Sequence, residues 1–214
     1  MSQFPALPAT FPSQMPPPIP QPPISYQPQP QSGPLQPYQP ATFNTLYLWW
    51  AIVVGLHLLL LLPSIIVYPL QYIAIPIFIA AIVFENLILY KAWNQIQDGC
   101  QRTTPAKAIG FGFIPFFNFY WWFTEYQGLA EDLNSFTRKY GLNTPSIAVP
   151  LAATVCILSI CKWLLFWVPV IGAMIAIAEI VILFILLHQV RLSAATIAQA
   201  KLTAAAQAGT LPIR

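Results

Sequence analysis

Four runs of about 20 apolar residues constrain this chain most, because a helix of that length crosses the hydrocarbon core of a bilayer. The runs cover Leu46–Val67, residues 72–92, Ile147–Trp167 and Ile171–Val190. Only a short turn separates the members of each pair, which predicts two helical hairpins. Aromatic residues gather at the ends of the runs, as they do at membrane–water interfaces. The sequence predicts an all-α integral membrane protein with four transmembrane helices in two hairpins.

The composition agrees with a surface that faces lipid rather than water. Only 7% of the 214 residues are charged and 57% are hydrophobic, whereas a soluble domain is usually about 25% charged. The net charge of +3 comes without any Lys- or Arg-rich run, which argues against nucleic acid as a partner. The cysteines Cys100, Cys156 and Cys161 lack the spacing of a zinc site, so we expect no metal.

Residues 1–44 differ from the rest of the chain. They hold 14 of the 23 prolines, many glutamines and no charged side chain. Such a segment has too little apolar surface to offset the loss of chain entropy, and proline removes backbone donors. We expect a disordered tail with polyproline II character. It serves either as a solvated spacer or as a docking segment for a cytoplasmic protein partner.

The linker between the hairpins, residues 93–146, contains a segment broken by proline. Thr104 and Pro105 suit the start of a helix, whereas Pro115 should break or kink it. Gly141 suits the position just past a helix end. We predict a re-entrant start followed by an amphipathic helix in the membrane surface. Its apolar stripe recurs every three or four residues and consists of Phe119, Trp122, Tyr126, Leu129, Leu133, Phe136 and Tyr140.

Basic residues decide between four spans and the alternative, a fifth span over about 108–123. With five spans, Arg191, Lys201 and Arg214 would face outward, against the positive-inside rule. With four spans, the two hairpin turns carry no Lys or Arg, and both chain termini are cytoplasmic. The chain then divides into the tail, a hairpin over 45–92, the linker over 93–146, a hairpin over 147–191 and an Ala-rich C-terminal helix and tail over 192–214.

Four ionisable residues fall inside the predicted spans. His57 and Glu85 lie at similar depth on the arms of the first hairpin, as Lys162 and Glu179 do in the second. A charge in hydrocarbon costs at least about 2.5–3.5 kcal/mol, so such residues usually pair or face a cavity. We therefore predict the pairs His57–Glu85 and Lys162–Glu179, acting either as a proton or ion path or as interhelical glue. The depths of His57 and His188 differ by about 10 Å, which argues against a shared haem, and we expect no cofactor.

Three stretches of the linker carry a resemblance: WNQIQDG at 93–99, TTPAKA at 103–108 and FIPFFNFYW at 113–121. They resemble a group of uncharacterised bacterial polytopic membrane proteins with a domain of unknown function. Members of that group also tend to carry proline- and glutamine-rich cytoplasmic tails. The resemblance implies a location in the bacterial inner (plasma) membrane and a helix–proline–helix elbow. It brings no activity.

These patterns predict a non-enzymatic protein, because the sequence contains no nucleophile elbow, zinc-protease helix or glycine-rich phosphate loop. We expect a membrane adaptor or organiser whose tail and surface helix contact partners. The alternative is a small transporter or channel component that uses the four intramembrane residues and forms a homo-oligomer. The elbow, which either contacts partners or seats in the lipid bilayer, comprises Pro115, Phe116, Phe117, Asn118, Trp121 and Trp122.

Overall fold

The structure is a computed structural model that describes residues 39–66, 70–165 and 167–208. Most of these residues are helical, and none of them forms a strand. Most of the predicted tail, residues 1–38, and the last six residues of the chain lie outside the described residues. The tail was predicted to reach residue 44, but the first helix already begins at Pro40. A proline suits the first turn of a helix, where its missing N–H is not needed.

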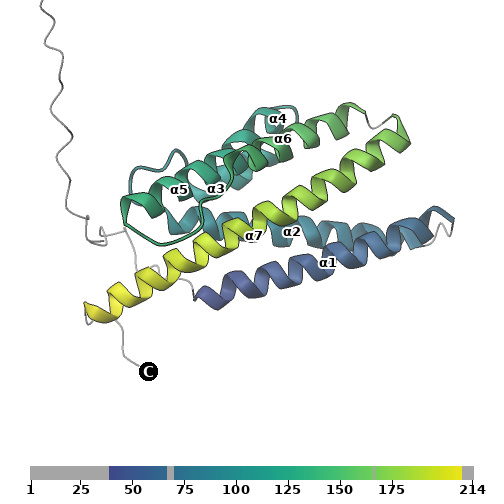
Figure 1. Cartoon of the computed structure of the whole chain (residues 1–214). Coiled ribbons are helices and arrows are strands. Elements are labelled where there is room, and N and C mark those ends of the chain that lie inside the picture. Colours follow the sequence, from purple (N-terminus) through teal and green to yellow (C-terminus); the bar gives the residue numbers. More distant parts are fainter. Residues whose placement is uncertain (1–38, 67–69, 166, 209–214) are drawn as a thin grey trace, which may run out of the picture.

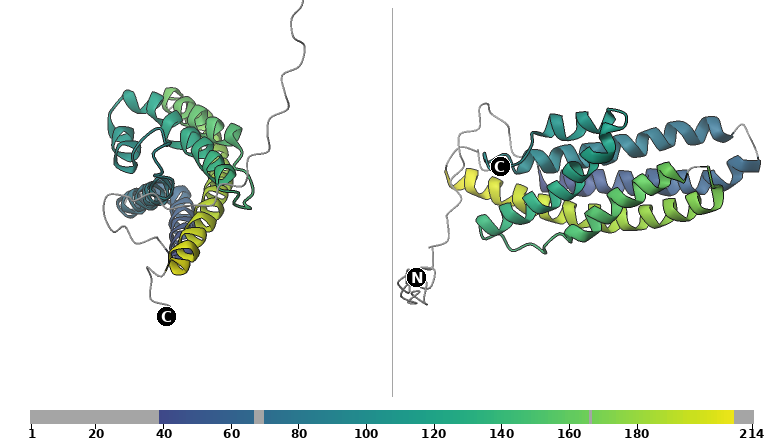
Figure 2. Two further views of the ribbon diagram at one scale, coloured as in Figure 1. Left: turned by 90° about the vertical axis from the view of Figure 1, so that its left-hand side faces the viewer. Right: turned by 90° about the horizontal axis from the view of Figure 1, so that it is seen from above.

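Two antiparallel hairpins form the long axis of the molecule (Figure 1). In the first, α1 (Pro40–Ile66) packs along α2 (Gln71–Gln95), and in the second, α6 (Val149–Leu164) packs along α7 (Pro169–Gln207). Because α7 also contacts α1 and α2, the hairpins form one bundle (Figure 2). We call the end with the two hairpin turns the turn end, and the opposite end, where the linker lies, the linker end.

Within the part of the chain that the structure describes, three helices are long and apolar enough to cross a membrane: Pro40–Leu60, Tyr72–Gln95 and Val170–Gln207. The fold is thus that of a helical membrane protein. The remaining apolar helix, α6, covers the predicted third span. It has 16 residues and a length of about 24 Å, somewhat less than the hydrocarbon core of about 30 Å. In contrast, α7 has 39 residues and continues unbroken from the predicted fourth span into the predicted C-terminal helix.

The linker contains no single helix over 108–123. Two helices of six residues each occupy this region, and Pro115 lies in the break between them. The first of the two is about 9 Å long, far too short to cross a bilayer. The second begins only at Phe117 and continues into the helical turns that follow, so no continuous helix covers 108–123. The elements of the linker are α3 (Pro105–Gly110), the 3₁₀ turn η2 (Phe111–Phe113), α4 (Phe117–Trp122), the π-helix η3 (Phe123–Gly128) and α5 (Leu129–Lys139).

The ends of these linker helices are fixed by local hydrogen bonds. The Thr104 hydroxyl accepts from the backbone N–H of Lys107 at 3.4 Å, which caps α3 as expected. At the end of α5, Gly141 has a φ of +61°, and the next N–H, that of Leu142, donates to the carbonyl of Thr137 at 2.8 Å. This is the Schellman geometry that favours glycine just past a helix end.

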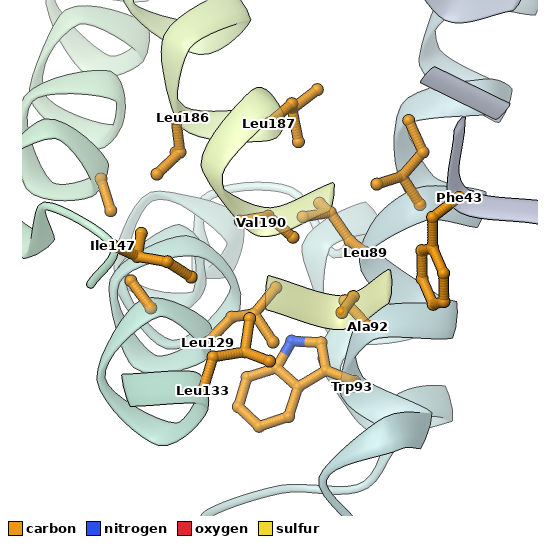
Figure 3. Close-up of a cluster of buried hydrophobic side chains, with 14 of the residues drawn as sticks. Phe43, Leu89, Ala92, Trp93, Leu129, Leu133, Ile147, Leu186, Leu187 and Val190 are labelled. Atoms are coloured by element: carbon orange, nitrogen blue, oxygen red, sulfur yellow. The ribbon is translucent and has the colours of Figure 1, made fainter. Parts of the chain in front are cut away.

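The apolar stripe of α5 packs against protein, which corrects the prediction of a helix lying in the membrane surface. Leu129 and Leu133 are fully buried in a core that includes Trp93 of α2 and Val190 of α7 (Figure 3). The stripe itself was predicted, but the extension of α7 past Val190 covers it. The α5 part of the stripe, with Leu129, Leu133 and Phe136, is therefore not available to lipid or to a partner. The remaining residues of the stripe, Phe119, Trp122, Tyr126 and Tyr140, are only half-buried.

Asp98 holds the linker against the end of α5. Its carboxylate accepts from Lys139 Nζ at 2.8 Å, from the backbone N–H of Cys100 at 3.0 Å and from the Tyr140 hydroxyl at 3.3 Å. Burial alone would raise the pKa of Asp98, but these hydrogen bonds outweigh burial and lower the pKa below its usual value. The folded chain therefore holds a proton at Asp98 less tightly than the unfolded chain does.

We expect Asp98→Asn to lower the free energy of unfolding by about 1–2 kcal/mol at pH 7. A lowered folded-state pKa stabilises the fold above the unfolded value of about 3.9, and this stabilisation is lost as the pH falls through the folded pKa. The difference between the native chain and the variant should therefore shrink in acid. Unfolding in detergent at pH 7 and at pH 3, followed by circular dichroism, measures this difference. An equal difference at pH 7 and pH 3 would contradict the assignment.

Candidate functional site

A group of ionisable side chains gathers inside the bundle, where α2, η3, α6 and α7 meet. It joins both hairpins to the linker, because each of these elements contributes at least one member. We call it the carboxyl cluster. Its members are Glu85 of α2, Glu125 and Tyr126 of η3, Lys162 of α6 and Glu179 of α7.

In the second hairpin, the structure brings Lys162 and Glu179 together. Lys162 Nζ donates to one carboxylate oxygen of Glu179, and the Ser159 hydroxyl donates to the other at 2.5 Å. Glu179 is buried, and these two hydrogen bonds give each of its carboxylate oxygens a partner inside the protein. The two residues lie on facing helices near the turn end, at the depth that the short turn of this hairpin implies.

In the first hairpin, the predicted His57–Glu85 pair is not formed. Instead, Nδ1 of His57 lies 3.2 Å from the Ala74 carbonyl oxygen and its ring contacts Phe78. Glu85 accepts from the Tyr126 hydroxyl at 2.5 Å. The depth of each residue in the hairpin follows from counting along the chain, but its direction does not. Glu85 faces the linker and the second hairpin, where it is close enough to Glu179 for their charges to interact.

Glu125 is the member of the cluster that the sequence did not identify. Only 3% of it is exposed, and none of the hydrogen bonds among the described residues involves its carboxyl group. One carboxyl oxygen, Oε2, lies 2.9 Å from the point where a Cβ on Gly112 would stand, so a larger residue at 112 would displace the end of the Glu125 side chain. Burial raises the pKa of Glu125 to about 8, with a further contribution from the charge of Glu85. The group is therefore mostly protonated at neutral pH.

The π-helix η3 explains why Glu125 was missed. A regular helix would turn Glu125 away from the stripe that contains Tyr126, and the prediction assumed such a helix. The wider turn of a π-helix changes the direction of successive side chains, and such turns are frequent at functional sites. The signal available in the sequence was a single acidic residue in the aromatic run between Phe119 and Tyr126. Trp93 Nε1 of α2 donates a hydrogen bond to the backbone carbonyl of Glu125 at 3.3 Å.

The elbow contains the one non-glycine residue with positive φ among the described residues, Phe116, with a φ of +63° and a ψ of −39°. The N–H of Phe117 donates across it to the Pro115 carbonyl at 2.7 Å. This is a γ-turn of the rare, strained kind, which persists only where surrounding contacts hold it. The Phe116 ring at its tip is 84% exposed.

Contacts of the other elbow residues hold this strained turn in place. Trp121 Nε1 donates to the Ala108 carbonyl at 2.7 Å and its ring stacks on Phe117. Trp122 contacts the ring of Phe119, which in turn contacts Trp163 of α6. The side-chain oxygen of Asn118 is buried without a hydrogen-bond partner. Figure 2 shows the linker helices alongside the bundle. Just before the elbow, Gly112 of η2 adjoins the Glu125 carboxyl group.

The chemistry of the cluster is that of proton binding. Among the described residues, no group of three or more His, Cys, Asp and Glu side chains is arranged to hold a metal ion. The buried Cys156 thiol adjoins Glu125 without forming a disulfide. No protein family, no curated protein and no solved structure matches this chain. The interpretation therefore depends on the geometry of the carboxyl cluster itself.

Proposed function

We propose that this protein is a non-enzymatic, multi-pass membrane protein that conducts protons across the bilayer through the carboxyl cluster. The observation that carries the proposal is the meeting of three carboxyl groups in a protein with apolar helices long enough to cross a membrane. Glu125 and Glu179 are buried, and Glu85 is half-buried. Ionisable residues at membrane depth are costly, and proteins keep them where protons or ions bind or pass.

The order of the groups along the bundle supports a relay. Lys162 lies two residues before the turn end of α6 and contacts Glu179. Glu85 lies ten residues, about 15 Å, from the linker end of α2. The Tyr126 hydroxyl contacts Glu85. The backbone of the adjacent residue, Glu125, is hydrogen-bonded to Trp93, which lies two residues before the linker end of α2. A hydroxyl can accept one proton while it donates another, so Tyr126 suits the position between two carboxyl groups.

The proposal includes a topology of four spans, in which α6 and the apolar residues that flank it form the third span. The re-entrant elbow enters from the same side as the rest of the linker. Basic residues at the linker end, such as Arg102, Lys107 and Arg138, favour the cytoplasm for that side. Both termini are then cytoplasmic, and the resemblance of the elbow motif favours a bacterial inner membrane. A relay of this kind needs no open pore, so it does not require an oligomer.

Glu85→Gln and Glu125→Gln test the relay. We expect the purified full chain in liposomes to dissipate an imposed pH gradient, followed with a trapped pH-sensitive dye. Each substitution removes a proton-binding site and should lower the rate by roughly a hundredfold. Glu131→Gln is the matched control, because this carboxylate lies at the linker end and pairs with Arg102 outside the cluster. It should retain the rate of the native chain.

Two outcomes would overturn the relay. The first is a native chain that dissipates the gradient no faster than empty liposomes. The second is a variant with reduced thermal stability but an unchanged rate, which would make the carboxyl groups interhelical glue. Thermal unfolding of all three variants in detergent therefore accompanies the flux measurement.

A second function, that of a membrane adaptor or organiser, is favoured by the exposed aromatic face of the elbow. Phe113, Phe116 and Tyr120 are 67%, 84% and 68% exposed, and the turn that presents them is strained. An adaptor would show no proton flux. A specific partner that the native chain retains in a pull-down from membranes would no longer be retained by the Phe116→Ser variant or by a chain without residues 1–38. A partner lost only with the tail would assign docking to the tail alone.

A further inference from the structure

A polar groove of about 640 Å³ lies at the linker end, apart from the carboxyl cluster. One wall is α5, and the other is the irregular segment 142–148 that leads into the first turn of α6. Its polar lining includes Arg138, the hydroxyls of Ser135 and Ser146, and Thr144. Arg102 and Glu131 also line the groove, so it combines two cations, one carboxylate and several hydrogen-bond donors.

The walls of the groove are fixed to each other before any ligand binds. Asn134 uses both ends of its amide, since Nδ2 donates to the Ile147 carbonyl and Oδ1 accepts from the Ile147 N–H, both at 2.8 Å. The next N–H, that of Ala148, donates to Gln189 of α7 at 2.9 Å. The Schellman turn at Gly141 fixes the start of the same segment. A preformed groove avoids the cost of ordering its walls on binding.

The charge of the groove favours an anion. Arg102, at its rim, is neutralised by Glu131 and Asp132 at 2.7 and 2.9 Å. Arg138 differs, because no hydrogen bond or ion pair among the described residues involves its guanidinium. A free guanidinium beside hydroxyl groups matches a phosphate, which accepts two parallel hydrogen bonds from arginine.

The surroundings of the groove favour a phosphate that belongs to a lipid. Leu142 and Val149 supply an apolar part of its lining, and Val149 is the first residue of the apolar helix α6. The groove therefore lies where a membrane-inserted helix enters the linker layer, with apolar surface on one side and cationic surface on the other. Basic pockets beside membrane helices are a known setting for anionic headgroups.

We propose that this groove binds the phosphate headgroup of an anionic phospholipid, with Arg138 and the neighbouring hydroxyls on the phosphate. The acyl chains would follow the apolar surface of α6. This site does not depend on proton conduction, and either proposal can fail without the other.

Native mass spectrometry of the full chain in detergent, with equal amounts of phosphatidylglycerol and phosphatidylcholine, tests the site. We expect the anionic lipid to be retained preferentially, and Arg138→Gln to lower its retention about tenfold. Arg138→Lys keeps the charge without the planar fork and should give an intermediate value. Lys107→Gln makes the same change of charge outside the groove and should leave retention unchanged.

Three outcomes would overturn the proposal. Equal retention of the two lipids would show that no headgroup charge is recognised. An unchanged preference in Arg138→Gln, in a variant that still unfolds at the native temperature, would place the lipid elsewhere. Displacement of phosphatidylglycerol by millimolar inorganic phosphate would identify a free phosphate rather than a lipid as the ligand.

Discussion

Trp93→Ala should lower the free energy of unfolding by about 3–5 kcal/mol, the usual cost of removing a large buried aromatic side chain. Trp93 is completely buried where the end of α2 meets η3 and α5, and Figure 3 shows it beside Leu129 and Leu133. Its indole N–H also donates to the carbonyl of Glu125, so the substitution removes a link to the carboxyl cluster as well as packing.

Unfolding in detergent, followed by circular dichroism, measures this loss. Met174→Ala is the control, because that side chain is 67% exposed and should change the free energy by less than about 0.5 kcal/mol. Trp93→Phe should fall between the two, since it keeps much of the volume but loses the hydrogen bond. A loss for Trp93→Ala no larger than that of the control would show that the linker does not pack on α2 as described.

Lys162→Met should cost about 2–4 kcal/mol, because it leaves the buried Glu179 carboxylate without its cation. The double variant Lys162→Met/Glu179→Gln should recover most of this loss, since it removes the unpaired charge and leaves a neutral side chain that Ser159 can still contact. The same unfolding measurement on both single variants and the double variant gives the coupling energy. Additive losses would mean that the two side chains do not interact.

The sequence predicted the elements of the fold better than their partners. The apolar runs located α1, α2, α6 and about half of α7, because the requirement of the bilayer for about 20 apolar residues is independent of tertiary structure. The local signals at Thr104, Pro115 and Gly141 were also correct. Such signals depend only on neighbouring residues, and the hydrogen bonds at the ends of α3 and α5 lie within a few positions of them.

The candidate site was predicted only in part, for a geometric reason. Counting from a hairpin turn gives the depth of a residue and brought Lys162 near Glu179, but it could not give the side of the helix that His57 or Glu85 faces. Glu85 turns toward Tyr126, 41 positions away in the chain. Glu125 lies in a π-helix, whose wider turn departs from the regular period on which the sequence interpretation was based.

The unbroken length of α7 makes it a lever between the membrane and the linker layer. Glu179 and Lys201 belong to the same helix and lie 22 residues, about 33 Å, apart. At the far end, Lys201 Nζ donates to the Gln95 carbonyl at 2.5 Å and lies over the Phe136 ring. A tilt of about 10° pivoting at Glu179 would shift Lys201 by about 6 Å and break that contact. A change of charge in the carboxyl cluster that tilts α7 would therefore reach the linker end as a displacement large enough to follow with a pair of spin labels.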